Sequence, residues 1–394
     1  MAEPGTRAAR PASGTVHWLG AGLSTGSGLG AVAGQAASVV LWSRNLARAE
    51  DRREALGLSG SVHARALSWP ALAGAVAPGD VVVSMVPATE HPTVLRLCLD
   101  AGAHFACSSY TSPELAAAAP AATAAGLAVL TEAGLDPGID HLLALQLAER
   151  GRAAAGDAAT AAFGSYCGGL PAVPNEFRYR FSWAPRAVLS ALRQPARYLD
   201  DGRELVADHP WEAVRPLVLA GETFEVYPNR DSMPFLQRYG FPPGWRLRTF
   251  IRGTLRLDGW RAAWSPVFTE LVAGDPARID ELADELARRH PMTAQDRDRV
   301  VLAVELTLQD GAGTGWSGRY LLDALGTAQE TAMARCVSLP LAAGVLDVLA
   351  GRAAPGLRQA AEDPATAARW LAFLAEHGIT AAYTESTGGT APPA

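Results

Sequence analysis

The sequence has little cysteine, and its four cysteines are far apart. They stand at positions 98, 107, 167 and 336, and no CxxC pair or Cys/His ligand spacing joins them. A disulfide framework or a structural zinc site needs such paired spacing. The pattern therefore favours reduced thiols and predicts no metal site.

Long apolar runs are also missing. No run approaches the 18 residues that a membrane-spanning helix needs. The first 14 residues, MAEPGTRAARPASG, lack the apolar core of a secretory signal. The expectation is a soluble, cytoplasmic protein with no membrane partner.

Charge is sparse and slightly negative. Charged residues make up 19% of the chain, the net charge is −6 and the pI is about 5.8. A domain that wraps a phosphodiester backbone is normally basic, so we expect no nucleic-acid partner. Small anionic metabolites stay possible, because local arginines matter more to them than net charge.

The sequence contains enough apolar residues for a large packed core. Hydrophobic residues make up 49% of 394 residues, which is the composition of a globular enzyme and favours two domains. Residues 15–133 alternate short apolar runs with helical stretches, which indicates a Rossmann-like, doubly wound parallel sheet of the α/β class. The expected strands are Val16–Leu19, Ser38–Trp42, Val62–Leu67, Val81–Val86, His104–Cys107 and Ala128–Thr131, and the expected helices include Pro92–Ala101 and Pro113–Ala125.

After Asp140 the pattern changes, with more aromatic residues and arginines. Alternating residues predict strands, and a 3.6-residue apolar period predicts helices. The strands are expected at Phe177–Trp183, Leu247–Leu257, Val300–Gln309 and Gly318–Leu325, and the helices at Ala277–Arg289, 328–350 and 364–376, with a disordered tail from 384 to 394. We predict a Rossmann-like domain over 1–135, completed by 328–394, and a second α+β domain over 136–327.

A glycine-rich loop follows the first strand. The string VHWLGAGLSTGSG places glycines where backbone N–H groups can reach a pyrophosphate at a helix N-terminus. The spacing is GxGxxxG rather than GxGxxG, and a merely flexible strand–helix turn remains the alternative. The cofactor contacts predicted in this loop are Gly20, Gly22, Leu23, Ser24 and Gly26.

The end of the second strand indicates the choice of cofactor. The string LWSRNLARAE offers Ser43, Arg44 and Arg48 and has no acid before Glu50. A carboxylate there would hold the ribose 2′-OH of NAD, whereas an arginine can bind the 2′-phosphate of NADP. We therefore predict NADP; the alternative is that both arginines are solvated residues of a helix start. Val86, which ends the VVVSMV run, and Pro87, which follows it, are further candidate contacts.

Four short strings carry the candidate substrate site: SSYTSPEL (108–115), TEAGLDPGIDH (131–141), SYCGGLP (165–171) and YPNRDS (227–232). The first two follow strands of the parallel sheet, where open α/β sheets bind ligands. Chemistry at a C–N bond needs proton-handling groups, clamps for anionic substrate groups and room for backbone to approach. The candidates are Tyr110, Asp136 and Cys167 for catalysis, Arg186, Arg230 and Arg252 for carboxylates, and Gly134, Gly138, Gly168 and Gly169 for close approach.

The chain resembles the saccharopine reductase family, the glutamate-forming saccharopine dehydrogenases. GLDPGIDH, SYCGGLP, YPNRDS and RGTLR occur in the family's order, and TAMARCVSLPLAAGVL resembles its C-terminal return to the nucleotide domain. The resemblance covers about residues 15–380. It implies NADP-linked condensation of glutamate with α-aminoadipate semialdehyde to saccharopine, or the reverse, and a homodimer.

The same resemblance assigns roles to individual residues. It implies that Ser109 and Tyr110 border the nicotinamide, that Asp136 and Cys167 lie near the reacting C–N bond, and that Arg186 and residues 252–254 face substrate carboxylates. Asp136 with Tyr110 is our candidate proton-handling pair. The full predicted substrate set is Ser109, Tyr110, Asp136, Gly168, Arg186, Arg230, Arg252 and Thr254.

The match has departures, and they leave other functions open. The glycine loop is longer and more polar than the family's usual form, and the stretch PAVPNEFRYRFSW (171–183) is shorter than the usual insert and carries Arg180 where a lysine is common. The alternatives are an opine- or carboxynorspermidine-type reductive aminase with another substrate, and a regulator that binds NADP without turnover.

Several residues near these motifs have a structural alternative. Asp140 fits a helix N-cap, which would make His141 a first-turn residue. His91 fits either a cofactor contact or packing at a helix start. Cys167 fits a packed thiol as well as a site group, and Glu132 fits a role in orienting its neighbours.

Overall fold

A computed structural model describes residues 9–181, 185–293, 295–309 and 315–387. Its contacts divide the chain into two compact units. The first comprises Met1–Leu142 and Ala334–Gly378, and the second comprises Leu143–Met333 and Ile379–Ala394.

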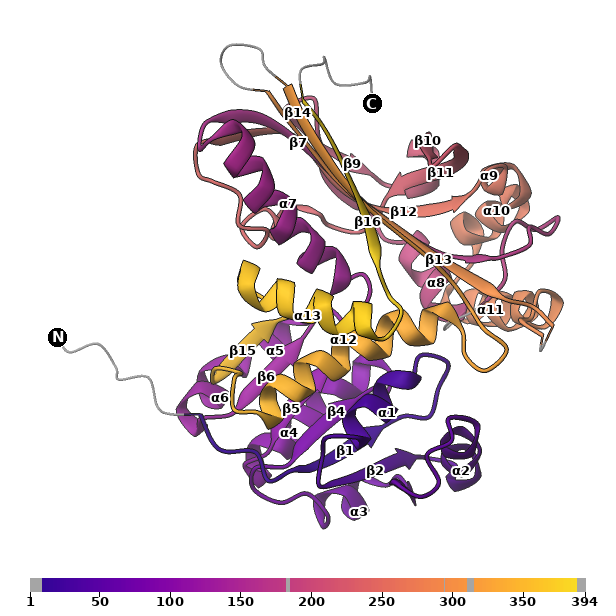
Figure 1. Cartoon of the computed structure of the whole chain (residues 1–394). Coiled ribbons are helices and arrows are strands. Elements are labelled where there is room, and N and C mark those ends of the chain that lie inside the picture. The colour runs from indigo at the N-terminus through magenta and orange to yellow at the C-terminus, as the bar shows by residue number, and fades with distance from the viewer. Residues whose placement is uncertain (1–8, 182–184, 294, 310–314, 388–394) are drawn as a thin grey trace. The chain divides into compact units, whose positions relative to one another are not determined.

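The described part of the first unit contains a seven-stranded parallel sheet, which confirms the predicted Rossmann-like architecture (Figure 1). Its order is β15-β6-β5-β4-β1-β2-β3. Strands β2 and β3 follow on one side of β1, and β4, β5 and β6 follow on the other, so the strand order reverses between β1 and β4. Ligands of such sheets bind at the carboxyl ends of the strands, at this switch point. The strands are β1 (Thr15–Leu19), β2 (Ser38–Ser43), β3 (Val62–Ala66), β4 (Val81–Ser84), β5 (His104–Cys107), β6 (Ala128–Thr131) and β15 (Gly356–Gln359).

Helices connect these strands, and side-chain caps start several of them. Asn45, Ser68, Ser112 and Asp363 each accept a backbone N–H of the first turn. The predicted helix Pro113–Ala125 is two helices that meet at Ala118. The helices are α1 (Ser27–Ala33), α2 (Leu46–Ala55), α3 (Trp69–Ala73), α4 (His91–Ala101), α5 (Pro113–Ala117), α6 (Ala119–Ala125), α12 (Ala332–Leu349) and α13 (Pro364–Glu376), with the 3-10 turn η1 (Ala88–Glu90). A further helix, α7 (Ile139–Ala155), begins in this unit, and its residues from Leu143 onward belong to the second unit.

Among the described residues, one helix is long and apolar enough to cross a membrane by length and composition. This is α12, whose 18 residues have a mean hydropathy of 1.6, but 78% of it is buried inside the protein. Such burial is typical of the core helix of a folded domain.

A buried polar cluster fixes three central strands. His17 on β1 accepts the indole N–H of Trp42 on β2 at Nδ1, so its Nε2 carries the proton that Asp80 accepts at 3.0 Å. Asp80, just ahead of β4, also accepts the Ser13 hydroxyl and the Ala77 amide. Buried polar groups are tolerated only with such partners, so this cluster orders β1, β2 and β4.

The described part of the second unit contains a nine-stranded mixed sheet. Its main path is β10-β11-β12-β7-β13-β14-β16, with β8 paired to β12 and β9 to β8; only β12 and β7 pair in parallel. The strands are β7 (Ala159–Pro171), β8 (Ala196–Asp200), β9 (Arg203–Ala207), β10 (Arg215–Leu219), β11 (Glu222–Pro228), β12 (Trp245–Leu257), β13 (Asp298–Gln309), β14 (Gly315–Leu325) and β16 (Ala381–Thr387).

Short helices of this unit pack around an aromatic core. Tyr179, Tyr227, Trp260, Trp264 and Phe268 are buried together. The helices are α8 (Pro185–Leu192), α9 (Trp260–Ala263), α10 (Ser265–Ala273) and α11 (Pro276–Arg289), with the 3-10 turns η2 (Pro210–Ala213) and η3 (Met233–Phe235).

Two local predictions are wrong. Phe177–Phe181 is a loop with one isolated bridge, from Phe181 to Pro291, because its aromatic side chains pack into the core instead of pairing as a strand; residues 182–184 lie outside the described residues. Thr384–Thr387 is not a disordered tail but the end of β16, which pairs with β14. Residues 388–394 lie outside the described residues.

The units also divide at other positions than the sequence suggested. The first unit extends to Leu142 rather than 135, and residues from Ile379 belong to the second unit. The second difference follows from β16, whose hydrogen bonds to β14 place it in the mixed sheet.

Candidate active site

The loops after β1 and β4 meet at the switch point of the parallel sheet. Gly20 has a φ of +110° and donates its amide to the Trp42 carbonyl at 2.8 Å. A Cβ at Gly20 would lie 2.7 Å from the Met85 carbonyl oxygen. Only glycine fits this position, which is the tight turn expected of a dinucleotide-binding loop.

The rest of the glycine loop is open. Gly22 is exposed and has no heavy atom within 4 Å of a Cβ placed on it, the Leu23 side chain is 50% exposed, and Ser24 is half-buried. Gly26 is the N-cap of α1 and has no side-chain capping bond. These features suit a backbone cradle for a phosphate.

Gly28, which was not among the predicted residues, allows helix α1 to pack closely against helix α12. A Cβ there would lie 2.0 Å from the Ser338 carbonyl oxygen of α12, and the Gly28 amide donates to Ser338 Oγ at 3.0 Å. The string GSGLG contains the signal, but its partner is 310 residues away.

The residues predicted for the 2′-phosphate lie at the end of β2 and the start of α2. Ser43 is half-buried, and Arg44 and Arg48 are exposed. Within the described residues neither guanidinium has an ion-pair partner, so both are available to an anion. Val86 is half-buried and Pro87 exposed after β4.

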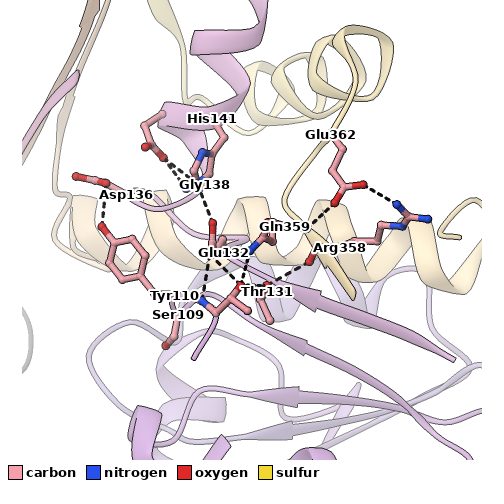
Figure 2. A network of polar contacts seen from close by, with 12 residues as sticks. Ser109, Tyr110, Thr131, Glu132, Asp136, Gly138, His141, Arg358, Gln359 and Glu362 are labelled. Atoms are coloured by element: carbon pink, nitrogen blue, oxygen red, sulfur yellow. Dashed lines mark hydrogen bonds and ion pairs between the residues drawn. The ribbon is translucent and has the colours of Figure 1, made fainter. Parts of the chain in front are cut away.

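Tyr110 and Asp136 lie together, as the proton-handling hypothesis requires. Tyr110 follows β5, Asp136 stands in the loop between β6 and α7, and both side chains are half-buried. Tyr110 Oη donates to Asp136 Oδ1 at 3.4 Å (Figure 2). This is long for an O–H···O bond, but catalytic hydrogen bonds are often long before substrate binds.

The loop that carries Asp136 is closed by backbone bonds. The Gly134 amide donates to the Pro137 carbonyl at 2.9 Å, and a Cβ at Gly138 would lie 1.9 Å from the Gly134 carbonyl oxygen. Asp140 is in the first turn of α7 rather than at its N-cap, and its Oδ1 accepts the Gly138 amide at 2.6 Å. The glycines of GLDPG therefore allow the backbone of this loop to pack closely on itself.

A second polar chain leads to Ser109. His91 Nδ1 lies 2.8 Å from Ser84 Oγ, and His91 Nε2 lies 3.0 Å from Ser109 Oγ. The His91 side chain is 1% exposed, and burial lowers its pKa from 6.5 to about 4. The ring is therefore neutral near pH 7, with one nitrogen donating and the other accepting. His91 is the buried first residue of α4, which confirms the predicted packing at a helix start, and it also orients Ser109.

The second unit brings Cys167, Arg252 and Thr254 together on one face of its sheet. Thr254 is the register partner of Cys167, and Arg252 is the partner of Ser165. Partners in register project to the same face, and residues two apart on a strand do so too. Cys167 and Thr254 are half-buried, whereas Arg252 is 2% exposed with its guanidinium 4.0 Å from the Phe235 ring centroid.

Other predicted residues of the second unit have structural contacts. Arg186 on α8 is exposed and pairs with Asp280 at 3.7 Å and Asp284 at 3.1 Å, both on α11. Arg230 has a φ of +56° and donates to Gln194 Oε1 at 3.1 Å. A Cβ at Gly168 would lie 2.2 Å from the Leu255 carbonyl oxygen, so the close approach there is by the neighbouring strand β12.

Both units match models of one protein family. Residues 16–130 match the saccharopine dehydrogenase NADP-binding domain, and residues 134–379 match the saccharopine dehydrogenase C-terminal domain. The chain belongs to the saccharopine dehydrogenase family. The NADP-binding domain confirms the predicted cofactor, because the open Gly22 loop and the two unpaired arginines fit a dinucleotide with a 2′-phosphate.

Individual relatives agree with this family. The chain is 42% identical over 196 residues to the Saccharomyces cerevisiae saccharopine dehydrogenase (NADP, L-glutamate-forming), covering 48% of this chain and 43% of that protein. It is 38% identical over 221 residues to the Schizosaccharomyces pombe enzyme of the same name, covering 55% and 47%. The chain thus spans about half the length of these curated relatives.

A solved structure extends the likeness to nearly the whole chain. Apo saccharopine dehydrogenase (L-Glu forming) from S. cerevisiae superposes with a TM-score of 0.79 at 27% identity, covering 94% of this chain and 99% of that one. A homospermidine synthase from Legionella pneumophila has a TM-score of 0.60 at 9% identity over 94% and 91%, which shows the fold alone.

Two residue types or groupings are absent. The sequence contains no lysine, so all 34 of its Lys and Arg residues are arginine. No lysine side chain is therefore available for acid–base chemistry. In the described part of the chain, no group of three or more His, Cys, Asp or Glu side chains is placed to hold a metal.

A cavity of about 310 Å³ in the first unit lies away from these residues. It is bounded by β6, β15, α12 and α13 and contains no predicted site residue. Parallel α/β sheets bind ligands at the carboxyl ends of their strands, so the site is assigned to that edge rather than to this cavity. Its charged lining includes Asp347, Arg352, Arg358, Glu362 and Arg369.

Proposed function

We propose that this protein is an NADP-dependent, L-glutamate-forming saccharopine dehydrogenase of lysine metabolism. The observation that carries the proposal is the Tyr110–Asp136 pair, at the carboxyl edge of an NADP-binding domain in a chain of this family. The names of the fungal relatives support the substrate, saccharopine. The reverse reaction condenses glutamate with α-aminoadipate semialdehyde.

The reaction breaks a C–N bond in two stages. Oxidation removes two electrons and a proton from carbon and a proton from the amine nitrogen, which leaves an imine. Water then adds to the imine carbon, and the C–N bond breaks to give glutamate and the semialdehyde. When bound, NADP supplies the electron acceptor of the first stage.

The chain's own residues hold the cofactor and move the protons. The Gly20–Gly26 loop binds the pyrophosphate through backbone N–H groups, and Arg44 and Arg48 bind the 2′-phosphate. As Tyr110 Oη accepts the proton of the amine nitrogen, it passes its own proton to Asp136 Oδ1. The pair then returns this proton to the imine nitrogen and removes a proton from the attacking water, and the Cys167 thiol is a further polar group for this step.

Arginines account for recognition of an anionic substrate. Saccharopine carries three carboxylates, and guanidinium groups bind carboxylates in a bidentate manner. Arg252 with Thr254 is our principal candidate clamp, because these residues share a sheet face with Cys167. We also propose substrate roles for Ser109, Gly168, Arg186 and Arg230, in line with the family motifs.

A substrate panel tests the proposal. NADPH oxidation is measured with α-aminoadipate semialdehyde and glutamate, then with each partner replaced by other aldehydes and amines. The proposal expects turnover that requires both glutamate and the semialdehyde. Turnover only with another pair would establish a different reductive aminase, and tight NADPH binding without any turnover would establish a regulator.

We also propose a homodimer and a cytoplasmic location. Both follow from the family resemblance and the composition. Light scattering on the purified chain should give twice the 41.2 kDa of one chain, and a monomer at enzyme-assay concentrations would contradict the dimer.

A further inference from the structure

Glu132 has two features that an ordinary buried residue lacks. It is the first residue after β6, its φ is +57°, and it is only 1% exposed. A left-handed conformation is costly for a residue with a Cβ, and a buried carboxylate is costly without partners. Such a residue persists only where surrounding contacts hold it in place.

The Glu132 side chain gathers partners from three segments (Figure 2). Its Oε1 accepts the Thr111 amide at 3.1 Å, the Thr111 hydroxyl at 2.9 Å and Gln359 Nε2 of β15 at 3.2 Å. Its Oε2 lies 3.3 Å from Nε2 of His141, in the first turn of α7. The buried acid is thus a junction between the loop after β5, the start of α7 and strand β15.

Both members of the proton-handling pair are attached to this junction. Tyr110 stands between Ser109, whose carbonyl accepts the Glu132 amide at 2.9 Å, and Thr111, which Glu132 Oε1 holds. Asp136 stands in the short loop between Glu132 and His141, whose side chains face each other. One residue therefore fixes the backbone on both sides of Tyr110 and both ends of the Asp136 loop.

We propose that Glu132, together with His141, is the positioning residue that sets Tyr110 Oη against Asp136 Oδ1. The proposal rests on the proposed function for its kinetic consequence, but not for its structural one. Glu132 is buried and acts through Thr111 and His141. Tyr110 and Asp136 are the residues that contact the reacting atoms. The distance between Tyr110 Oη and Asp136 Oδ1 depends on the loop after β5 and the loop between β6 and α7, and Glu132 contacts both.

The position calls for a carboxylate rather than an amide. Three donors converge on Oε1, and Oε2 faces an imidazole. A glutamine can present its one oxygen to Thr111 and Gln359, but its NH₂ group then faces His141 without the charge that Glu132 provides. The Asp136 loop would lose its attachment to the loop after β5.

Glu132→Gln tests the inference, with Glu362→Gln as the matched control. Glu362 is exposed and also bonds to β15, through the Gln359 amide and the Arg358 guanidinium. Amide hydrogen exchange over residues 109–112 gives a readout that needs neither cofactor nor substrate. We expect faster exchange in Glu132→Gln and wild-type exchange in Glu362→Gln.

Kinetics provide the second readout. A displaced catalytic pair loses about 10- to 100-fold in kcat, so Glu132→Gln is expected to fall in that range with the KM for NADP within about threefold of wild type. The pH dependence of kcat should shift in Glu132→Gln and stay unchanged in Glu362→Gln. Wild-type exchange together with wild-type kcat in Glu132→Gln would overturn the proposal.

A further variant covers the case in which Glu132→Gln does not fold. His141→Asn leaves the bonds of Glu132 to Thr111 and Gln359 intact, and we expect smaller changes in the same direction. Wild-type exchange and kcat in folded His141→Asn would then overturn the proposal. If the wild-type protein shows no saccharopine activity, the proposed function fails, and the exchange comparison still decides whether Glu132 holds the Tyr110 loop.

Discussion

At the scale of single residues, the candidate site depends on how neighbouring polar groups share protons. Tyr110 Oη and Asp136 Oδ1 are 3.4 Å apart, and Ser109 is held by His91. A tyrosine has an ordinary pKa near 10, so it needs a nearby acceptor to take part in proton transfer at neutral pH. Asp136 is placed to be that acceptor.

A double-mutant cycle on this pair tests whether the two residues act as one unit. Tyr110→Phe and Asp136→Asn should each lower kcat by about 100-fold, which is typical of losing a general acid or base. The double variant should be no more than about threefold worse than either single variant, because each single change already breaks the unit. Steady-state kinetics of the three variants check this, and losses that multiply would show independent roles.

His91 makes a prediction about stability and pH. Burial lowers its folded-state pKa from 6.5 to about 4, so between these values the unfolded state binds more protons. Stability is therefore complete above pH 6.5 and falls as the pH drops toward 4, with this group contributing a loss of about 2 kcal/mol between pH 7 and pH 5. Urea unfolding at both pH values should show that His91→Gln loses this part of the pH dependence. An unchanged pH dependence in the variant would contradict the account.

The sequence predicted some of these residues and not others. Tyr110 and Asp136 stand in recognisable strings directly after apolar strands, so their place at the sheet edge followed from the pattern. Glu132 and Gln359 are 227 residues apart and meet only because β15 pairs with β6. Local sequence could not give that pairing, since β15 is a short strand of mixed composition.

At the scale of elements, the glycines after β1 have two different roles. One allows close helix packing, and another leaves space for a ligand. Gly28 of α1 is pressed against the backbone of α12 at Ser338, whereas a Cβ placed at Gly22 would meet no heavy atom within 4 Å. Gly28 therefore contributes to stability, whereas Gly22 leaves space for a ligand.

Alanine at these two glycines should separate stability from binding. Gly28→Ala forces a Cβ against the Ser338 carbonyl and should lower the free energy of unfolding by about 1–3 kcal/mol. Gly22→Ala should leave that free energy within about 0.5 kcal/mol and weaken NADPH binding, because the Cβ occupies space beside the pyrophosphate. Denaturation and NADPH fluorescence titration measure the two effects, and equal destabilisation by both variants would contradict the assignment.

Elements buried on both faces were predictable, and those set by distant pairing were not. The apolar runs of β1, β4 and β6 are recognisable as buried strands from the sequence alone. The alternation in Phe177–Phe181 resembles a strand, but its rings pack among Trp260 and Trp264 in an aromatic core. The polar string of β16 resembles a tail and becomes a strand only because β14 offers an edge.

At the scale of the whole molecule, the chain uses arginine alone for its positive charge. Its 34 basic residues contain no lysine. In the proposed reaction the semialdehyde therefore meets no lysine amine of this chain that could form a Schiff base, and guanidinium groups stay protonated.

This composition predicts resistance to covalent trapping. Incubation with α-aminoadipate semialdehyde and borohydride should leave the chain with at most one adduct, at the N-terminal amine, and with full activity after the reagents are removed. Intact-mass spectrometry checks the adduct number, and a lysine-containing protein treated alongside is the control. An adduct on an internal residue with loss of activity would contradict the prediction.

The measurement that tests the account most directly is saccharopine-dependent reduction of NADP, followed by the absorbance of NADPH. The account predicts turnover with NADP that is slower with NAD, and a loss of at least about 100-fold in Asp136→Ala. Failure of the wild-type protein to reduce either cofactor with saccharopine would contradict the proposed function. Near-wild-type turnover in Asp136→Ala would remove the Tyr110–Asp136 pair from the chemistry.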